Sequence, residues 1–166
     1  MELFLPDEDA TLALGRALAL SLPEGWETPS ALLRAELGSG KTTLARGFVA
    51  ALPGCEQAEV ASPSFNLANI YPTRPQVLHL DLYRLGEGLT GDGLEELLEA
   101  GPADACRVLL VEWAQFMPEG SLPDDWLSIL LSEEGEGRRA VLEAHGPKAA
   151  LWLERTTRTY LKSDLS

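Results

Sequence analysis

The sequence is poor in cysteine, in basic side chains and in long apolar runs. Of its 166 residues only Cys55 and Cys106 are cysteines, and their spacing fits neither a disulfide framework nor a metal site, so we expect two reduced thiols. No apolar run approaches the roughly 20 residues of a membrane-spanning helix. The first residues also lack the basic start and apolar core of a secretion signal. We therefore expect a cytoplasmic protein that does not contact a membrane.

Basic residues are outnumbered two to one, with 13 Lys and Arg against 26 Asp and Glu, which gives a net charge of −13. A surface of this sign repels a polyanion such as RNA. Arg138-Arg139 is the only basic doublet, and it follows an acidic, glycine-containing turn at residues 133–137. We therefore do not expect direct binding of nucleic acid to be the main role of this chain. The length indicates one domain with a substantial core.

What the sequence does contain is a phosphate-binding loop. Residues 35–42 read Ala-Glu-Leu-Gly-Ser-Gly-Lys-Thr, with an apolar segment before them and a helical pattern after them. The two glycines allow backbone N–H groups to line a concave nest, and the helix that follows adds its N-terminal amides and positive dipole end. Ala35 stands where the full motif has glycine, at a position that opens the loop without holding phosphate. The predicted phosphate ligands are Gly38, Ser39, Gly40, Lys41, Thr42 and Thr43, with the Thr42 hydroxyl on Mg²⁺.

Hydrophobic periodicity and breaker residues predict alternating strands and helices. We expect an α/β fold, a P-loop NTPase-like three-layer sandwich around a small, partly parallel central sheet. Residues 1–146 would form a single domain, and residues 147–166 a C-terminal helical extension of it. The predicted strands are 31–35, 65–71, 76–81, 107–112, 126–131 and 138–144; the predicted helices begin after Asp7 and at 43, 94 and 151, and a glycine-rich loop spans 86–93.

Two predicted strands end in an acid, Asp81 and Glu112. Functional groups of open α/β sheets gather at the carboxyl ends of the strands, where the phosphate loop also lies. One of the two acids could be the Mg²⁺-side carboxylate and the other could polarise an attacking water. Each could instead be a solvated strand end, but two acids beside a phosphate loop favour a joint role with Lys41.

Three further positions have two interpretations each. The run Ser62-Pro63-Ser64 lies where nucleotide switches place a hydroxyl that senses Mg²⁺ and the terminal phosphate, or it is an ordinary proline turn. Trp113 could stack on a partner or on nucleotide, or cover the sheet edge. His79, in the middle of a strand, is interpreted as a packed core histidine and not as a base.

Taken together, these motifs resemble the TsaE (YjeE) family, the bacterial ATPases of tRNA threonylcarbamoyladenosine (t6A) biosynthesis. The resemblance extends over about residues 6–145, and the run His-x-Asp-Leu-Tyr-Arg at 79–84 is its most specific part. It implies a P-loop NTPase fold, ATP or ADP and Mg²⁺ as ligands, and the TsaB and TsaD proteins as partners. In that family ATP hydrolysis is thought to reset the partner complex, while TsaD carries out the transfer to tRNA.

The resemblance also implies roles for individual residues. Thr42 and Asp81 would handle Mg²⁺, and Glu112 would act beside the metal and the attacking water. Ser64 matches a position that is more often Thr in the family, and Thr11 lies in a helix that runs near the adenine there. Ala35 and Ala114 depart from the family pattern, and the tail from residue 147 has no counterpart.

Two other classes of function remain compatible with the residues. A nucleotide-gated binding module would use ATP occupancy alone, with hydrolysis incidental. A small-molecule kinase would need an arginine-rich lid and an acceptor pocket, and residues 86–106 contain no arginine.

Overall fold

The computed structural model describes residues 1–26, 28–64, 66–85 and 106–163. The predicted loop at 86–93 and the predicted helix beginning at 94 lie outside this part of the chain. The strands are β1 (Glu2–Leu5), β2 (Ser30–Ala35), β3 (Ala68–Tyr71), β4 (Gln76–Asp81), β5 (Arg107–Glu112), β6 (Trp126–Glu134) and β7 (Gly137–His145). The helices are α1 (Glu8–Leu20), α2 (Lys41–Ala50) and α4 (Pro147–Ser163), with short 3-10 turns η1 (Cys55–Gln57), η2 (Tyr83–Leu85), η3 (Ala114–Phe116) and η4 (Glu119–Ser121).

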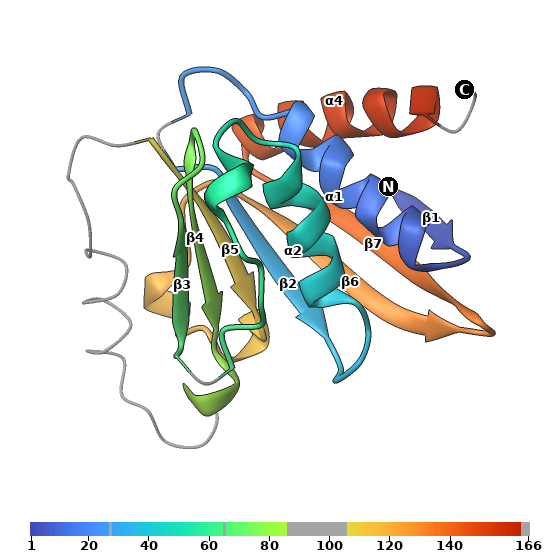
Figure 1. Cartoon of the computed structure of the whole chain (residues 1–166), viewed down its shortest axis with the longest axis horizontal. Coiled ribbons are helices and arrows are strands. Elements are labelled where there is room, and N and C mark those ends of the chain that lie inside the picture. Colours follow the sequence, from blue (N-terminus) through green and yellow to red (C-terminus); the bar gives the residue numbers. More distant parts are fainter. Residues whose placement is uncertain (27, 65, 86–105, 164–166) are drawn as a thin grey trace.

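The strands form one seven-stranded sheet in the order β1-β7-β6-β2-β5-β4-β3 (Figure 1). Its centre, β6-β2-β5-β4, is parallel, whereas β7 and β3 pair antiparallel with its two sides. Parallel strands deliver their carboxyl ends to the same edge, so the segments that follow β2, β4 and β5 meet there. The predicted α/β class with a partly parallel central sheet is confirmed.

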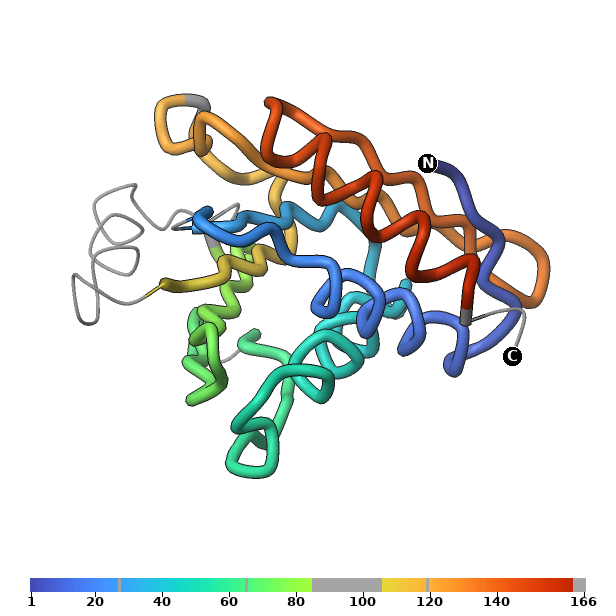
Figure 2. The backbone as a smooth tube through the Cα atoms, turned by 90° about the horizontal axis from the view of Figure 1, so that it is seen from above, coloured from blue at the N-terminus to red at the C-terminus, as the bar shows by residue number. Residues whose placement is uncertain are grey.

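Helices α1, α2 and α4 pack on one face of the sheet, as the two views show (Figure 1 and Figure 2). Beneath them lies the larger apolar core, in which Phe48 and Trp152 are fully buried. A smaller apolar cluster covers the other face of β2, β4 and β5 with residues from the η3 and η4 region. Among the described helices, none is long and apolar enough to cross a bilayer.

Close contact between α1 and α2 fixes the start of α2 relative to the sheet. Gly15 of α1 and Gly47 of α2 lie at the crossing, where a Cβ on either residue would clash with a backbone carbonyl oxygen of the other helix, that of Leu44 or Leu12. The side chain of Asp7 caps α1 by accepting a hydrogen bond of 2.8 Å from the Ala10 N–H, as the sequence indicates.

The elements differ from the prediction in several places. Strand β1 was missed, because a four-residue edge strand that pairs with β7 has little sequence pattern of its own. The strand predicted at 65–71 begins at Ala68, since Asn66 and Leu67 donate backbone hydrogen bonds to the Pro63 carbonyl and form a turn. The last helix is longer than predicted, and its Trp152 indole donates a hydrogen bond of 2.9 Å to the Leu18 carbonyl in the main core.

Candidate functional site

The loop between β2 and α2 has the conformation that its glycines allow. Gly38 and Gly40 have φ values of 78° and 99°, a region that side-chain-bearing residues rarely adopt. Gly40 is also the residue that precedes α2, so the loop leads directly into the helix N-terminus. The Ser39 hydroxyl donates a hydrogen bond of 2.7 Å to the Glu36 carbonyl and closes the turn. Within the described part of the chain, positive φ at a non-glycine residue occurs only at Leu67 and Trp113, so Ala35 replaces glycine without this strain.

Lys41 is the cation of this loop, and it is 6% exposed. Its Nζ donates hydrogen bonds to the carbonyl oxygens of Ala35 at 3.2 Å and Glu36 at 2.6 Å. Burial lowers the pKa of the Lys41 ammonium, and the negative charges of Glu112 and Asp81 partly offset this effect. The ammonium is therefore held by dipoles at the loop and attracted by two nearby carboxylates.

Asp81 and Glu112 are the last residues of adjacent parallel strands and are register partners in the β4–β5 pair. Each is 2% exposed. Both oxygens of Asp81 accept hydrogen bonds, Oδ2 from the Ser64 hydroxyl at 2.8 Å and Oδ1 from the Tyr83 N–H at 2.9 Å. The predicted switch hydroxyl and the predicted Mg²⁺-side carboxylate are thus in direct contact.

Glu112 lies between the loop and the interior of the sheet. Its Oε1 accepts a hydrogen bond of 3.4 Å from the Thr42 hydroxyl and lies 2.8 Å from His79 Nε2. His79 is fully buried, so its interpretation as a core histidine is correct for its position but incomplete, because its ring contacts a predicted site residue. The sequence signal for this contact was the position of His79 two residues before Asp81, on the strand that pairs with the strand of Glu112.

These side chains surround one cavity of about 230 Å³ at the carboxyl edge of the parallel strands. It contains every predicted site residue except Thr11. Its lining residues are Leu37, Gly38, Ser39, Gly40, Lys41, Thr42, Thr43, Ser62, Ser64, Asp81, Glu112 and Trp113. Thr11 is fully buried in α1, and its hydroxyl donates a hydrogen bond of 3.1 Å to the Asp7 carbonyl. The predicted contact of Thr11 with a nucleotide stays a prediction.

Trp113 forms one wall of the cavity. Its φ of 57° is a strained conformation for a side chain of this size, and such strain is common at functional sites. Its ring centre lies 4.5 Å from Lys41 Nζ, 4.9 Å from the ring centre of Tyr83 and 6.1 Å from that of Phe116. The half-buried indole therefore packs against the loop cation on one side and an aromatic cluster on the other.

Arg138 was missed by the sequence interpretation. Its side chain reaches from β7 to the phosphate loop, where its Nε would lie 3.0 Å from a Cβ added to Gly40. The neighbouring Arg139 points elsewhere and forms two hydrogen bonds of 2.9 Å with Glu134. The alternation of side chains along a strand could have predicted that the two arginines point to opposite faces of the sheet. Arg138 lies on the same face as Ala140 and Leu142, which contact the helix-covered core.

The oxygen donors of the site suit a hard cation. Thr42, Asp81 and Glu112 offer one hydroxyl and two carboxylates around the cavity. In the described part of the chain, no group of three His, Cys, Asp or Glu side chains could enclose a metal by itself. Mg²⁺ typically binds to one or two carboxylates together with substrate phosphates, so this donor set fits it when a polyphosphate is present.

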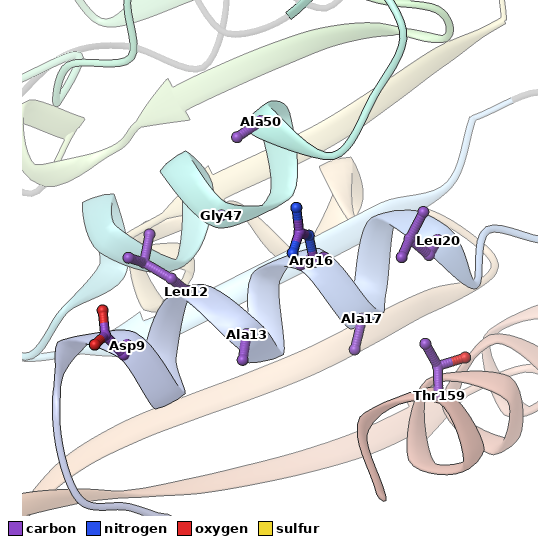
Figure 3. A pocket seen from close by; sticks show the side chains of 9 residues that line it. All are labelled: Asp9, Leu12, Ala13, Arg16, Ala17, Leu20, Gly47, Ala50 and Thr159. Carbon is purple, nitrogen blue, oxygen red and sulfur yellow. The ribbon is translucent and has the colours of Figure 1, made fainter. Parts of the chain in front are cut away.

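A second cavity, of about 390 Å³, lies over α1 between α2 and α4 (Figure 3). Alanine, leucine and glycine residues supply most of its wall, with Asp9 and Arg16 as its charged groups. It lies away from the strand ends that carry Asp81 and Glu112. Of these two cavities, the smaller one at the phosphate loop has the cation, hydroxyls and carboxylates that a catalytic site requires.

Comparison with known proteins identifies the family. The model of the family described as "Threonylcarbamoyl adenosine biosynthesis protein TsaE" matches residues 5–141. The chain belongs to the TsaE family. A TsaE protein of Nostoc sp. is 34% identical over 139 residues, covering 83% of this chain and 82% of its own, and one of Streptomyces coelicolor is 42% identical over 106 residues, covering 61% and 66%. The crystal structure of Bacillus subtilis YdiB is similar with a TM-score of 0.73, covers 95% of this chain and 94% of its own, and is 24% identical, which supports the shared fold.

Proposed function

We propose that this TsaE-family chain is a Mg²⁺-dependent ATPase that serves tRNA threonylcarbamoyladenosine biosynthesis. The observation that supports the proposal is that the phosphate loop, including Lys41 and Thr42, lines the same cavity as Asp81 and Glu112. Phosphoryl transfer needs held phosphates, a held metal and a positioned nucleophile, and it needs little covalent chemistry from the protein. This cavity has side chains suited to each of those tasks.

The roles follow from position. Backbone N–H groups of residues 38–42 and the N-terminus of α2 would hold the β- and γ-phosphates. The Lys41 ammonium would exchange its carbonyl contacts for phosphate oxygens. Ser64 orients Asp81, and Glu112 would accept a hydrogen bond from the attacking water. Mg²⁺, held by Thr42 and Asp81, would neutralise charge that develops on the phosphate oxygens.

We further propose that the chain acts with TsaB and TsaD and meets tRNA only through them. The relatives carry the name "tRNA threonylcarbamoyladenosine biosynthesis protein", which ties them to the same modification. A net charge of −13 disfavours direct binding of tRNA, so partner proteins would supply that contact. Hydrolysis would then be slow in the isolated chain and would rise when partners complete the site.

The proposal is tested by phosphate release from Mg-ATP, measured for the chain alone and with purified TsaB and TsaD. We expect slow release that rises sharply with the pair. Lys41→Ala should lower it by about 10²-fold or more, the typical loss when one preorganised electrostatic group is removed. Near-normal release by Lys41→Ala would contradict the site assignment.

Glu112→Gln separates hydrolysis from simple occupancy, because it keeps the shape of the side chain and removes its charge. We expect this variant to bind Mg-ATP and its partners but to release no phosphate and to support no tRNA modification. Modification that persists with Glu112→Gln would favour a nucleotide-gated binding module. Transfer of the phosphate to a small molecule and not to water would favour a kinase.

A further inference from the structure

A buried hydrogen-bond chain extends from Glu112 into the sheet and back to the surface. His79 Nε2 lies 2.8 Å from Glu112 Oε1, and His79 Nδ1 lies 3.3 Å from the Tyr71 hydroxyl. That hydroxyl lies 3.1 Å from the carbonyl oxygen of Ala61, which also accepts a hydrogen bond of 3.1 Å from Asn69 Nδ2. The three side chains come from the neighbouring strands β3, β4 and β5 (Figure 1).

The proton positions in this chain are constrained. An ionised Glu112 can only accept, so His79 Nε2 must carry a proton. Burial raises the pKa of the Tyr71 hydroxyl, which therefore stays protonated and can donate. The Tyr71 hydroxyl donates to the Ala61 carbonyl, which also accepts from Asn69, and the hydroxyl oxygen lies 3.3 Å from His79 Nδ1. The geometry thus places a proton on His79 Nε2, from which the ring donates to Glu112.

We propose that His79 is a positioning residue for Glu112, and that Tyr71 and His79 together link Glu112 to the segment 61–64. This inference rests on the proposed ATPase function. The same segment carries Ser64, whose hydroxyl donates to Asp81, so both acids of the cavity are tied to it, one through a hydroxyl and the other through the buried ring. A shift of 61–64 would therefore alter both carboxylates at once.

The contact from His79 determines the orientation of Glu112 more than the Thr42 contact does. The contact between His79 Nε2 and Glu112 Oε1 is buried and 2.8 Å long, whereas the Thr42 hydroxyl lies 3.4 Å from the same oxygen. Short bonds to an ionised acceptor are roughly twice as strong as neutral ones. Loss of the ring would leave a buried carboxylate free to turn toward the Lys41 ammonium, away from the position from which it would orient water.

The test compares His79→Leu, His79→Gln and Tyr71→Phe in phosphate release, with binding of a fluorescent ATP analogue measured in parallel. We expect kcat of His79→Leu to fall by about 10- to 100-fold, as when an outer-shell partner of a site residue is removed, with the Kd of the analogue unchanged. His79→Gln keeps an amide donor for Glu112 and should recover much of the rate. Tyr71→Phe should give an intermediate loss.

Two control variants separate positioning from general stability. Leu142→Ala removes core volume on β7, and Tyr160→Phe removes a buried hydroxyl on α4, both outside the cavity. We expect each to lower the melting temperature without lowering kcat per nucleotide-binding site. A kcat of His79→Leu equal to that of these controls, after correction for binding-competent protein, would overturn the inference.

A second measurement does not depend on hydrolysis. The chain has two histidines, so ¹⁵N-histidine NMR of the nucleotide-free protein gives two ring systems, and His145→Gln assigns them. We expect His79 to carry a proton on Nε2, with an Nδ1 shift that changes in Tyr71→Phe; an Nε2 without a proton would overturn the inference. Activity that is lost in Lys41→Ala but kept in His79→Leu would overturn this inference alone, whereas a wild type that hydrolyses no ATP with its partners would overturn both proposals.

Discussion

The Ser64 hydroxyl donates a hydrogen bond of 2.8 Å to Oδ2 of Asp81. The donor lies in a loop after α2 and the acceptor at the end of β4, and both residues line the cavity. A second hydroxyl, that of Ser62, lies 2.6 Å from Ser64 Oγ. The predicted switch segment therefore contacts the carboxylate directly, and a ligand that competes for Asp81 would have to replace this bond.

Replacing Ser64 tests whether the docked hydroxyl assists the metal site. We expect Ser64→Ala to raise the Mg²⁺ concentration needed for half-maximal phosphate release by about tenfold, in line with the loss of one outer-shell partner. Ser64→Thr keeps the hydroxyl and should stay close to the wild type. Ser132→Ala, at an exposed position on β6, serves as the control. An unchanged Mg²⁺ requirement in Ser64→Ala would show that the bond is merely local packing.

The two arginines at the start of β7 form a matched pair for testing nucleotide contact. Arg138 lies against Gly40 of the phosphate loop, whereas the Arg139 guanidinium pairs with Glu134 and lies 3.2 Å from Glu2. We expect Arg138→Gln to weaken ATP binding by at least about tenfold, since a hydrogen bond to a charged group contributes about 1.5–3 kcal/mol. Arg139→Gln should leave the Kd unchanged. Equal effects of the two substitutions would point to overall surface charge as the cause.

The phosphate loop and the strand-end acids could be predicted because their signals are local. A glycine-rich turn between a strand and a helix specifies its own backbone, and the parallel strands ending in Asp81 and Glu112 had to reach the same edge of the sheet. Local pattern also predicted the hairpin of β6 and β7 and the cap at Asp7.

Pairings between distant segments could not be predicted in this way. Arg138 is about 100 positions from Gly40, and neither local sequence indicates that the Arg138 side chain reaches the phosphate loop. The residues next to His79 in the sequence are those of an ordinary buried strand. Its contact with Glu112 depends on which strand pairs with β4. The crossing of α1 and α2 at two glycines likewise depends on tertiary packing.

The exposed pair of Glu134 and Arg139 gives a pH dependence of stability with a definite sign. Hydrogen bonds from Arg139 hold the pKa of the Glu134 carboxyl below its usual 4.5. Since the folded pKa is depressed, the contribution to stability is present above pH 4.5 and is lost as the pH falls through the lowered pKa. We expect Glu134→Gln to lower the melting temperature slightly at neutral pH, with the difference disappearing in acid and in high salt. Glu136→Gln, in the same turn, is the control, and a difference that grows in acid would contradict this sign.

The crossing of α1 and α2 predicts an effect opposite to helix propensity. In an open helix, Gly→Ala stabilises by about 1 kcal/mol, but a Cβ on Gly47 would clash with the Leu12 backbone and push α1 away from α2. We expect Gly47→Ala to destabilise by about 1–3 kcal/mol, the usual cost of overpacking, measured by urea unfolding. Gly120→Ala is the matched control, because a Cβ there meets nothing within 4 Å. Because α2 begins at Lys41, displacement of this helix should also weaken binding of the ATP analogue. A Gly47→Ala variant that is more stable than the wild type would show that the two helices can separate freely.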